Sequence, residues 1–267
     1  MNLIQAIVLG AVQGLTEFLP ISSTAHLIII PKFLGWEDPG LTFDVALHLG
    51  TLVALLIFFW REWLHLFQSG IDYARGRSRD PLLWYIIVAT IPGGIAGLLF
   101  EKKADRDLRD LRIIAAALIL LALVLVVAEL KGRKRKDIGQ ISFSDAVIVG
   151  CAQALAIVPG VSRSGVTITA GLFREMKRDA AARFSFFLST PLIAGAIAKK
   201  GLEIAKEGLP SAEVLPFIAG VVVSAIVGFA AIKILLTFLQ NHSTFVFVYY
   251  RVALGVVLCL AFWYGIH

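Results

Sequence analysis

The sequence has little charge for its length. Of its 267 residues, 16% are charged, whereas 58% are apolar or aromatic and the mean hydropathy is +0.83. A water-facing surface needs more charged side chains than this, and a disordered chain has fewer apolar ones. The composition therefore excludes a disordered chain, argues against an ordinary soluble domain and predicts a polytopic membrane protein.

Several chemical signatures are also missing. Both cysteines, Cys151 and Cys259, lie in apolar stretches, which predicts small core residues rather than a disulfide or a metal pair. The chain has no Walker loop, no HExxH or CxxC pattern and no nucleotide-binding glycine motif. The first basic residue is Lys32, so we expect no cleavable signal peptide.

Basic residues gather in short runs between the apolar blocks. The formal net charge is +6, from 25 Lys and Arg against 19 Asp and Glu. A nucleic-acid-binding protein would present one continuous basic face, whereas separate runs suit anionic lipid headgroups. We therefore expect membrane lipids as partners and no nucleic acid.

Six apolar blocks have about the 20 residues that a helix needs to cross the ~30 Å hydrocarbon core of a bilayer. They lie at roughly 42–60, 82–100, 112–130, 184–200, 214–238 and 245–264. We predict one transmembrane helix in each block.

Two further apolar segments, Leu3–Ile30 and Phe143–Phe173, contain a proline and several polar residues in the middle. A polar loop cannot face lipid, because its unpaired backbone groups would cost several kcal/mol each. A helix, a buried turn and a returning helix satisfy this constraint. We therefore predict two re-entrant helical hairpins, sheltered by the six spans.

The two interrupted segments resemble each other at an offset of about 140 residues. The matching residues, with small gaps, are Gly10, Gln13, Leu15, Pro20, Ser22 and Ser23 in the first and Gly150, Gln153, Leu155, Pro159, Ser162 and Ser164 in the second. We predict a single membrane domain of two repeats, 1–142 and 143–267, each a hairpin followed by three spans. Because three is odd, the repeats have opposite orientations and their hairpins meet near the middle of the bilayer, where inverted-repeat proteins place their functional site. The predicted fold class is an all-α polytopic membrane protein with six transmembrane helices and two re-entrant helical hairpins in an inverted repeat.

The basic loops predict an orientation. Loops 61–80 and 131–142, together with the turn at 177–178, carry more basic residues than 101–111 and 199–206. By the positive-inside rule the first set is cytoplasmic. Both termini and the mouth of the first hairpin then face the outer, periplasmic side.

The first hairpin carries a carboxylate, hydroxyls and an imidazole. Gln13 and Glu17 are four residues apart and share one face of a helix, while Ser23 and His26 share a face of the helix that restarts after the turn. A carboxylate at membrane depth is costly and therefore indicates function. In the alternative interpretation, Glu17 lies at the membrane surface and Ser22 and Ser23 only cap a helix, although capping does not explain His26.

The second hairpin carries an arginine among small hydroxyl residues. It reads Pro159-Gly160-Val161-Ser162-Arg163-Ser164-Gly165-Val166-Thr167. Proline and glycine force a turn, and the helix after it offers unpaired N–H groups and a positive dipole end to an anion. Arg163 adds a forked, permanently charged donor that suits phosphate. Alternatively, Arg163 is the structural partner of Glu17 in a buried ion pair, and the two roles are compatible.

Four other polar residues of the apolar blocks receive structural interpretations. We expect His48 to be a hydrogen-bonded histidine between helices rather than a ligand. We expect Asp44 to interact with the N-terminal dipole of its helix. Lys233 and Arg251 are expected to extend toward the membrane interface.

Together, the two turns offer the groups that hydrolysis of a phosphate anhydride with a lipid tail would need. Arg163 and helix-end N–H groups would neutralise the phosphoryl oxygens while the apolar tail stays in the bilayer. The main alternative is a secondary transporter or flippase of a phosphorylated lipid or anion, because many transporters are inverted repeats with broken helices. The pair Ser23 and His26 favours the enzyme, since transport alone requires neither. A membrane scaffold would leave Glu17 and Arg163 unexplained.

At these two motifs the sequence resembles the undecaprenyl-diphosphate phosphatase family, integral-membrane enzymes also known for bacitracin resistance. QGLTEFLPISSTAH at residues 13–26 matches the family's glutamate-rich first motif, and PGVSRSGVT at 159–167 matches its PGxSRSxxT motif. The similarity runs nearly end to end. It implies removal of one phosphate from a polyprenyl diphosphate lipid, undecaprenyl diphosphate, which yields inorganic phosphate and the lipid carrier of peptidoglycan synthesis. It also implies the bacterial inner (plasma) membrane and a divalent cation, Mg²⁺ or Ca²⁺; a homodimer is an assembly that the sequence leaves open.

The resemblance also implies roles for individual residues. Glu17 matches the family's second motif glutamate, and Arg163 matches its phosphate-binding arginine. Ser23 and His26 match the catalytic serine and histidine. Gln13 stands where many members have a first glutamate, so Glu17 would bind the cation alone or with phosphate oxygens. We expect the remaining polar residues of the two motifs to contact the substrate: Gln13, Ser22, Thr24, Ser162, Ser164, Gly165 and Thr167.

Two mechanisms remain open at this stage. In the first, Ser23 attacks the terminal phosphoryl group and His26 or Glu17 accepts its proton, while Arg163 holds the transferring phosphate and a cation near Glu17 neutralises the leaving oxygen. In the second, Glu17 or His26 activates a water molecule and Ser23 only donates a hydrogen bond.

Overall fold

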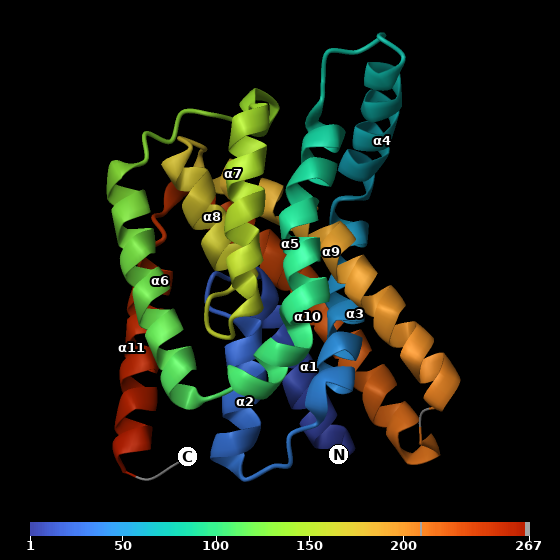
Figure 1. Ribbon diagram of the computed structural model, residues 1–267, viewed down its shortest axis with the longest axis vertical. Helices are drawn as coiled ribbons and strands as arrows, with labels where there is room; N and C mark the ends of the chain where they lie inside the picture. The colour runs from blue at the N-terminus through green and yellow to red at the C-terminus, as the bar shows by residue number, and fades with distance from the viewer. Residues whose placement is uncertain (209, 265–267) are drawn as a thin grey trace.

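The computed structural model describes residues 1–208 and 210–264 and contains no strand over that range (Figure 1). Its α-helices are α1 (Leu3–Phe18), α2 (Ser23–Leu34), α3 (Gly40–Phe58), α4 (Trp60–Ala74), α5 (Leu82–Asp107), α6 (Leu111–Lys131), α7 (Phe143–Ala154), α8 (Arg163–Phe173), α9 (Arg178–Glu207), α10 (Ser211–Asn241) and α11 (Phe245–Trp263). Two short 3-10 helices, η1 (Ile138–Gln140) and η2 (Leu155–Ile157), flank α7. The last three residues of the predicted second repeat lie outside the described residues.

Six helices are long and apolar enough to cross a membrane, as the sequence predicted. They are α3, α5, α6, α9, α10 and α11. Helix α9 begins at Arg178, six residues before the predicted apolar block at 184–200. A helix can extend beyond its apolar part into the polar interface of the membrane. The prediction of a plain loop at 61–80 was wrong, since most of it belongs to α4, which buries Trp63, Leu66 and Gly70 along one face.

The two interrupted segments each fold as a helix, a turn and a second helix. Helix α1 ends where Leu19, which precedes a proline, becomes extended, and α2 begins four residues later at Ser23. In the second segment, α7 and η2 lead into the turn at Pro159, and α8 begins at Arg163. Figure 1 shows α1 and α2 toward one end of the molecule and α7 and α8 toward the other, with the turns at mid-height.

The two turns have the same local backbone structure. Ser22 and Ser162 precede α2 and α8 with φ angles of 76° and 71°, values that residues other than glycine rarely adopt. Each hydroxyl accepts a hydrogen bond from the N–H group three residues later, at Ala25 (3.4 Å) and at Gly165 (3.0 Å). Strained backbone of this kind persists only where the surrounding packing holds it. Ser22 therefore caps α2, which is the role that the alternative interpretation of the first hairpin gave it.

Glycines let the broken helices approach long helices closely. A Cβ atom on Gly10 of α1 would lie 2.5 Å from the carbonyl oxygen of Gly220 on α10. A Cβ atom on Gly150 of α7 would lie 2.4 Å from the carbonyl oxygen of Ala89 on α5. Each short helix is thus fixed against a spanning helix from the other half of the sequence, and this contact sets the depth of its turn.

Candidate active site

Glu17, in the last turn of α1, lies at the centre of a buried polar cluster. It is 7% exposed, and its Oε2 accepts hydrogen bonds from Ser23 Oγ at 2.6 Å and Gln13 Nε2 at 3.1 Å. Its Oε1 accepts from Arg163 Nη1 at 3.3 Å. His48 Nε2 lies 3.3 Å from Oε2. The predicted shared helix face of Gln13 and Glu17 is confirmed. The ion pair with Glu17, which was the alternative role for Arg163, is also present.

The breaks in the chain bring these groups together. Ser23 and Arg163 are each the first residue of the helix that follows a turn, so the positive N-terminal ends of α2 and α8 both lie beside Glu17. The turns also bond directly to each other. Gly160 N–H donates to Ser22 Oγ at 3.2 Å, and Ser164 Oγ donates to the carbonyl oxygen of Leu19 at 3.1 Å.

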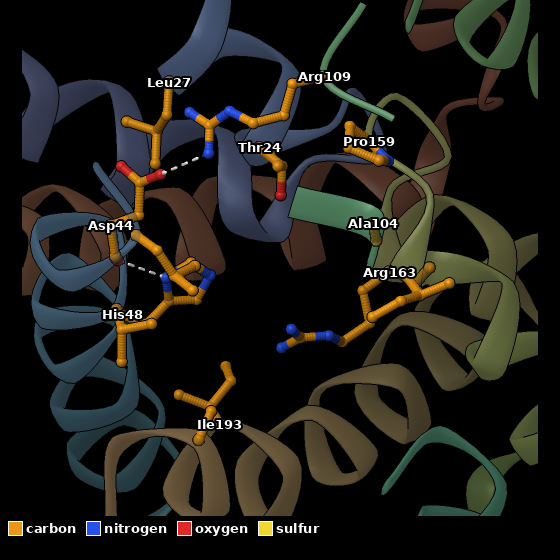
Figure 2. A pocket seen from close by; sticks show the side chains of 14 residues that line it. Thr24, Leu27, Asp44, His48, Ala104, Arg109, Pro159, Arg163 and Ile193 are labelled. Atoms are coloured by element: carbon orange, nitrogen blue, oxygen red, sulfur yellow. Dashed lines mark hydrogen bonds and ion pairs between the residues drawn. The ribbon is translucent and has the colours of Figure 1, made fainter. Parts of the chain in front are cut away.

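Two adjoining cavities open beside this cluster. The smaller, of about 20 Å³, has room for about one water molecule. It is lined by Glu17, Ser22, Ser23, Thr24, His48, Ala156, Val158, Ser162 and Arg163. The larger, of about 180 Å³, shares several of these residues and extends toward Asp44 and Arg109. In Figure 2, Arg163 reaches into it from one side and His48 from the other.

The remaining predicted contact residues do not line either cavity. Thr167 Oγ1 donates to the Arg163 carbonyl oxygen at 2.7 Å and lies 2.6 Å from Ser185 Oγ. Ser164 and Gly165 are buried in the first turn of α8. Gln13, Ser164, Gly165 and Thr167 line neither cavity, so in this conformation they support the groups that do.

The His26 ring bonds to groups other than Ser23. Its Nδ1 donates to the Ser22 carbonyl oxygen at 2.7 Å, and its Nε2 lies 2.6 Å from the Tyr250 hydroxyl. Both ring nitrogens are therefore occupied. Glu17 Oε2, at 2.6 Å, is the acceptor that the Ser23 hydroxyl contacts.

Sequence reasoning gave His48 a structural role and missed its contact with Glu17. Because a carbonyl oxygen can only accept, His48 Nδ1 donates to the Asp44 carbonyl oxygen at 2.7 Å. The other ring nitrogen, Nε2, lies 3.3 Å from the Glu17 carboxylate. The signal was the spacing of Asp44 and His48, four residues apart on one face of an otherwise apolar helix.

The predictions for Asp44 and Arg251 were wrong. Asp44 lies beyond the first turn of α3, and its carboxylate is 3.9 Å from Arg109 Nη1. Both residues line the larger cavity. Arg251 does not extend to the membrane interface but is 0% exposed in the protein interior. The surroundings of Asp44 and Arg251 could not be predicted from the sequence of one helix, because the residues that they contact lie on distant segments.

The cluster offers limited ligands to a divalent cation. No group of three His, Cys, Asp or Glu side chains that could hold a metal occurs within residues 1–208 and 210–264. Beside Glu17, however, the buried Gln13 Oε1 has no hydrogen-bond partner. Carboxylate and amide oxygens are ligands that Mg²⁺ and Ca²⁺ prefer, at six or more per ion. The residues thus fit a cation whose other ligands come from a bound phosphate or water.

This arrangement can perform nucleophilic chemistry on an anion. A hydroxyl nucleophile touches a carboxylate that can accept its proton, and a guanidinium and two helix N-termini can neutralise phosphoryl oxygens. The six apolar helices and the charged centre between the turns define a polytopic integral membrane protein with an internal polar site.

The chain belongs to the family described as bacitracin resistance protein BacA, whose model matches residues 6–257. Similar curated proteins include the undecaprenyl-diphosphatase of Moorella thermoacetica, 53% identical over 264 residues that cover 98% of this chain and 99% of the relative. The undecaprenyl-diphosphatase of Desulforudis audaxviator is 49% identical over 256 residues, covering 96% of both chains. That of Geotalea daltonii is 47% identical over 266 residues, covering 98% of this chain and 97% of the relative. The family resemblance predicted from the two motifs is confirmed.

Proposed function

We propose that this protein hydrolyses undecaprenyl diphosphate to undecaprenyl phosphate and inorganic phosphate, and so recycles the lipid carrier of peptidoglycan synthesis and gives resistance to bacitracin. Relatives about half identical over nearly the whole chain carry the name undecaprenyl-diphosphatase. The observation that carries the proposal is the buried contact of Ser23 Oγ with Glu17 Oε2 at 2.6 Å, with Arg163 on the other carboxylate oxygen at 3.3 Å.

In the proposed reaction, Ser23 Oγ attacks the terminal phosphorus and its proton passes to Glu17 Oε2. The bond from that phosphorus to the bridging oxygen breaks, Glu17 passes the proton to that oxygen, and undecaprenyl phosphate leaves. Water then attacks the phosphoserine and gives a proton to Glu17. The bond to Ser23 Oγ breaks, Glu17 returns the proton to Ser23 Oγ, and inorganic phosphate leaves. Arg163, released from Glu17 as the anion enters, holds the equatorial oxygens of the transferring group.

We propose that Glu17, with Gln13 Oε1 beside it, would hold a divalent cation. When bound, the cation would supply charge neutralisation at the leaving oxygen. The proposal is supported by the unpartnered buried oxygen of Gln13 next to the only carboxylate of the cluster that contacts Ser23.

We propose two inverted repeats, 1–142 and 143–267, with the α1–α2 and α7–α8 units as re-entrant hairpins. Support comes from the matched serines Ser22 and Ser162, which share a left-handed backbone and the same capping bond. It also comes from matched packing, since α1 packs on α10 while α7 packs on α5, the corresponding helix of the other repeat.

The proposed location is the inner membrane, with the site open to the periplasmic side. The larger cavity is lined by Ala104, near the C-terminal end of α5, and by Arg109. Figure 1 shows this end of α5 at the same end of the molecule as the start of α1 and the end of α11. We propose that the lipid tail leaves this cavity through an apolar cleft of about 300 Å³ between α5 and α9. The cleft shares Ala196 with the cavity and is also lined by Thr90, Gly94, Gly97, Leu98, Pro191, Leu192, Gly195 and Lys199.

Phosphate release by detergent-purified protein tests the function. Detergent leaves no compartments, so release means catalysis, whereas a protein that only transports would release nothing. Arg163→Ala should lose at least about 100-fold in kcat/KM, and a chelator should remove wild-type activity. Arg61→Ala, which changes an exposed arginine on Trp60, is the matched control and should stay near wild type. An Arg163→Ala variant with more than half of wild-type activity would contradict the proposal.

A further inference from the structure

Arg251, in the middle of α11, is a fully buried cation that the proposed reaction does not use. It is among the largest side chains in the protein with almost no exposure. Within the described ranges, no carboxylate lies within 4.0 Å of its guanidinium, which bonds only to backbone carbonyl oxygens. A buried charge without a counter-ion is costly in a membrane protein and is kept only where it has a use.

The guanidinium joins three separate segments. Nη1 donates to the Pro20 carbonyl oxygen in the first turn at 3.1 Å. Nη2 donates to the carbonyl oxygens of Gly160 at 2.8 Å and Val161 at 3.4 Å in the second turn. Nε and Nη2 also reach the α6 carbonyl oxygens of Leu118 at 3.2 Å and Ala117 at 3.3 Å. One side chain therefore bonds to both turns and to the spanning helix beside them.

These carbonyl groups need a donor. A turn buried in a membrane protein has carbonyl oxygens that neither a helix nor water satisfies, and each would be costly if left alone. Arginine has five N–H donors in a rigid planar fork, whereas lysine has three at a single point. Lysine could keep the charge at position 251 but could not span Pro20 and Gly160 together.

We propose that Arg251 is a positioning residue that holds the two turns in register. Through Pro20 it fixes the segment between Glu17 and Ser23, and through Gly160 it fixes the segment that carries Arg163. The expected effect of Arg251 on catalysis rests on the proposed function. The linkage of the two turns through Arg251 can also be measured without any activity.

Hydrogen exchange on the wild-type protein tests the linkage directly. The turns at 19–22 and 158–162 should open together, with one opening free energy, because one side chain holds both. In Arg251→Lys, exchange should rise in both turns at once while α10 stays protected. Separate opening of the two turns in the wild type, or unchanged exchange in the variant, would overturn the proposal whatever the activity of the protein.

Kinetics separate positioning from general destabilisation. In Arg251→Lys, kcat should fall at least about ten-fold because Ser23 and Arg163 lose their relative placement, while KM stays within about three-fold because the charge is kept. Lys233→Met removes an exposed cation from the spanning helix α10 and should change neither constant. A kcat that stays at the wild-type value per folded Arg251→Lys protein would overturn the proposal.

Discussion

At the residue scale, the proposal that Glu17 accepts the Ser23 proton depends on the contacts of Ser23 and His26. Ser23 Oγ contacts Glu17 at 2.6 Å, whereas both nitrogens of His26 are bonded elsewhere, to the Ser22 carbonyl oxygen and to Tyr250. The sequence left both acceptors open, because Ser23 and His26 are three residues apart on one helix. The turn places the end of α1 next to the start of α2, and this contact supports Glu17 as the acceptor in the proposed reaction.

Substitutions at Ser23 test covalent catalysis. Ser23→Ala should lose at least about 1,000-fold in kcat because the nucleophile is gone. Wild-type protein quenched during turnover should carry phosphate on Ser23, detected by mass spectrometry of the 13–26 segment. Thr237→Val, which removes an exposed hydroxyl that bonds only within α10, is the control. Near-normal turnover of Ser23→Ala would favour water as the nucleophile instead.

At the element scale, short helices depend on anchors at their ends. Helix α7 is held at its N-terminus by Asp145, whose carboxylate accepts from Lys136 Nζ at 2.8 Å and Arg174 Nε at 2.7 Å. Burial raises the pKa of Asp145, but hydrogen bonds from Lys136, the Ser142 N–H and Arg174 outweigh burial and lower it from 3.8 to about 2. This anchor ties α7 and the loop before it to the end of α8.

Removal of the Asp145 anchor should have a pH-dependent cost. The pKa is lower in the folded state, so the stabilisation is complete above about pH 4 and is lost as the pH falls toward 2. Asp145→Asn should lower Tm by about 5 °C at pH 7 and by less at pH 3, measured by thermal unfolding in one detergent. Asp137→Asn breaks an exposed pair with Lys177 in the same region and should have almost no effect. An equal Tm difference at both pH values would contradict the account.

The cleft between α5 and α9 gives a second prediction at this scale. A Cβ atom on Gly195 would meet nothing within 4 Å, so a larger side chain fits the fold but fills the cleft. Gly195→Leu should raise KM for undecaprenyl diphosphate about ten-fold with little change in kcat, because tail binding is the same in ground and transition states. Gly201→Leu, at an equally open glycine of α9 outside the cleft, is the control. Equal KM values for the two variants would show that the tail lies elsewhere.

At the scale of the whole molecule, length and hydropathy predicted the six long helices, and proline with polar residues predicted the two turns. Those signals are local. His48 does contact another helix, as predicted, but its partner Glu17 could not be named because it comes from a distant segment. The role of Arg251 was misjudged because its partners, the turn carbonyl groups, also lie on distant segments. Helix α4 was missed because only block length was considered, although its apolar residues repeat every three to four positions.

The proposed orientation can be tested in cells. With Cys151 and Cys259 replaced by serine, Glu37→Cys should react with a membrane-impermeant maleimide added from outside. Ser78→Cys should react only after the membrane is opened, because the basic 61–80 region is expected to be cytoplasmic. The reverse labelling pattern would invert the proposed topology and place the cavity on the cytoplasmic side.

The most direct test of the central claim is an experimental structure with a non-hydrolysable methylene-bridged analogue of undecaprenyl diphosphate. We expect the terminal phosphorus to lie within about 3.5 Å of Ser23 Oγ, in line for attack. Arg163 should donate hydrogen bonds to the oxygens of the terminal phosphate, and the lipid tail should lie between α5 and α9. A diphosphate bound away from the two turns, with Glu17 still paired to Arg163, would contradict the account.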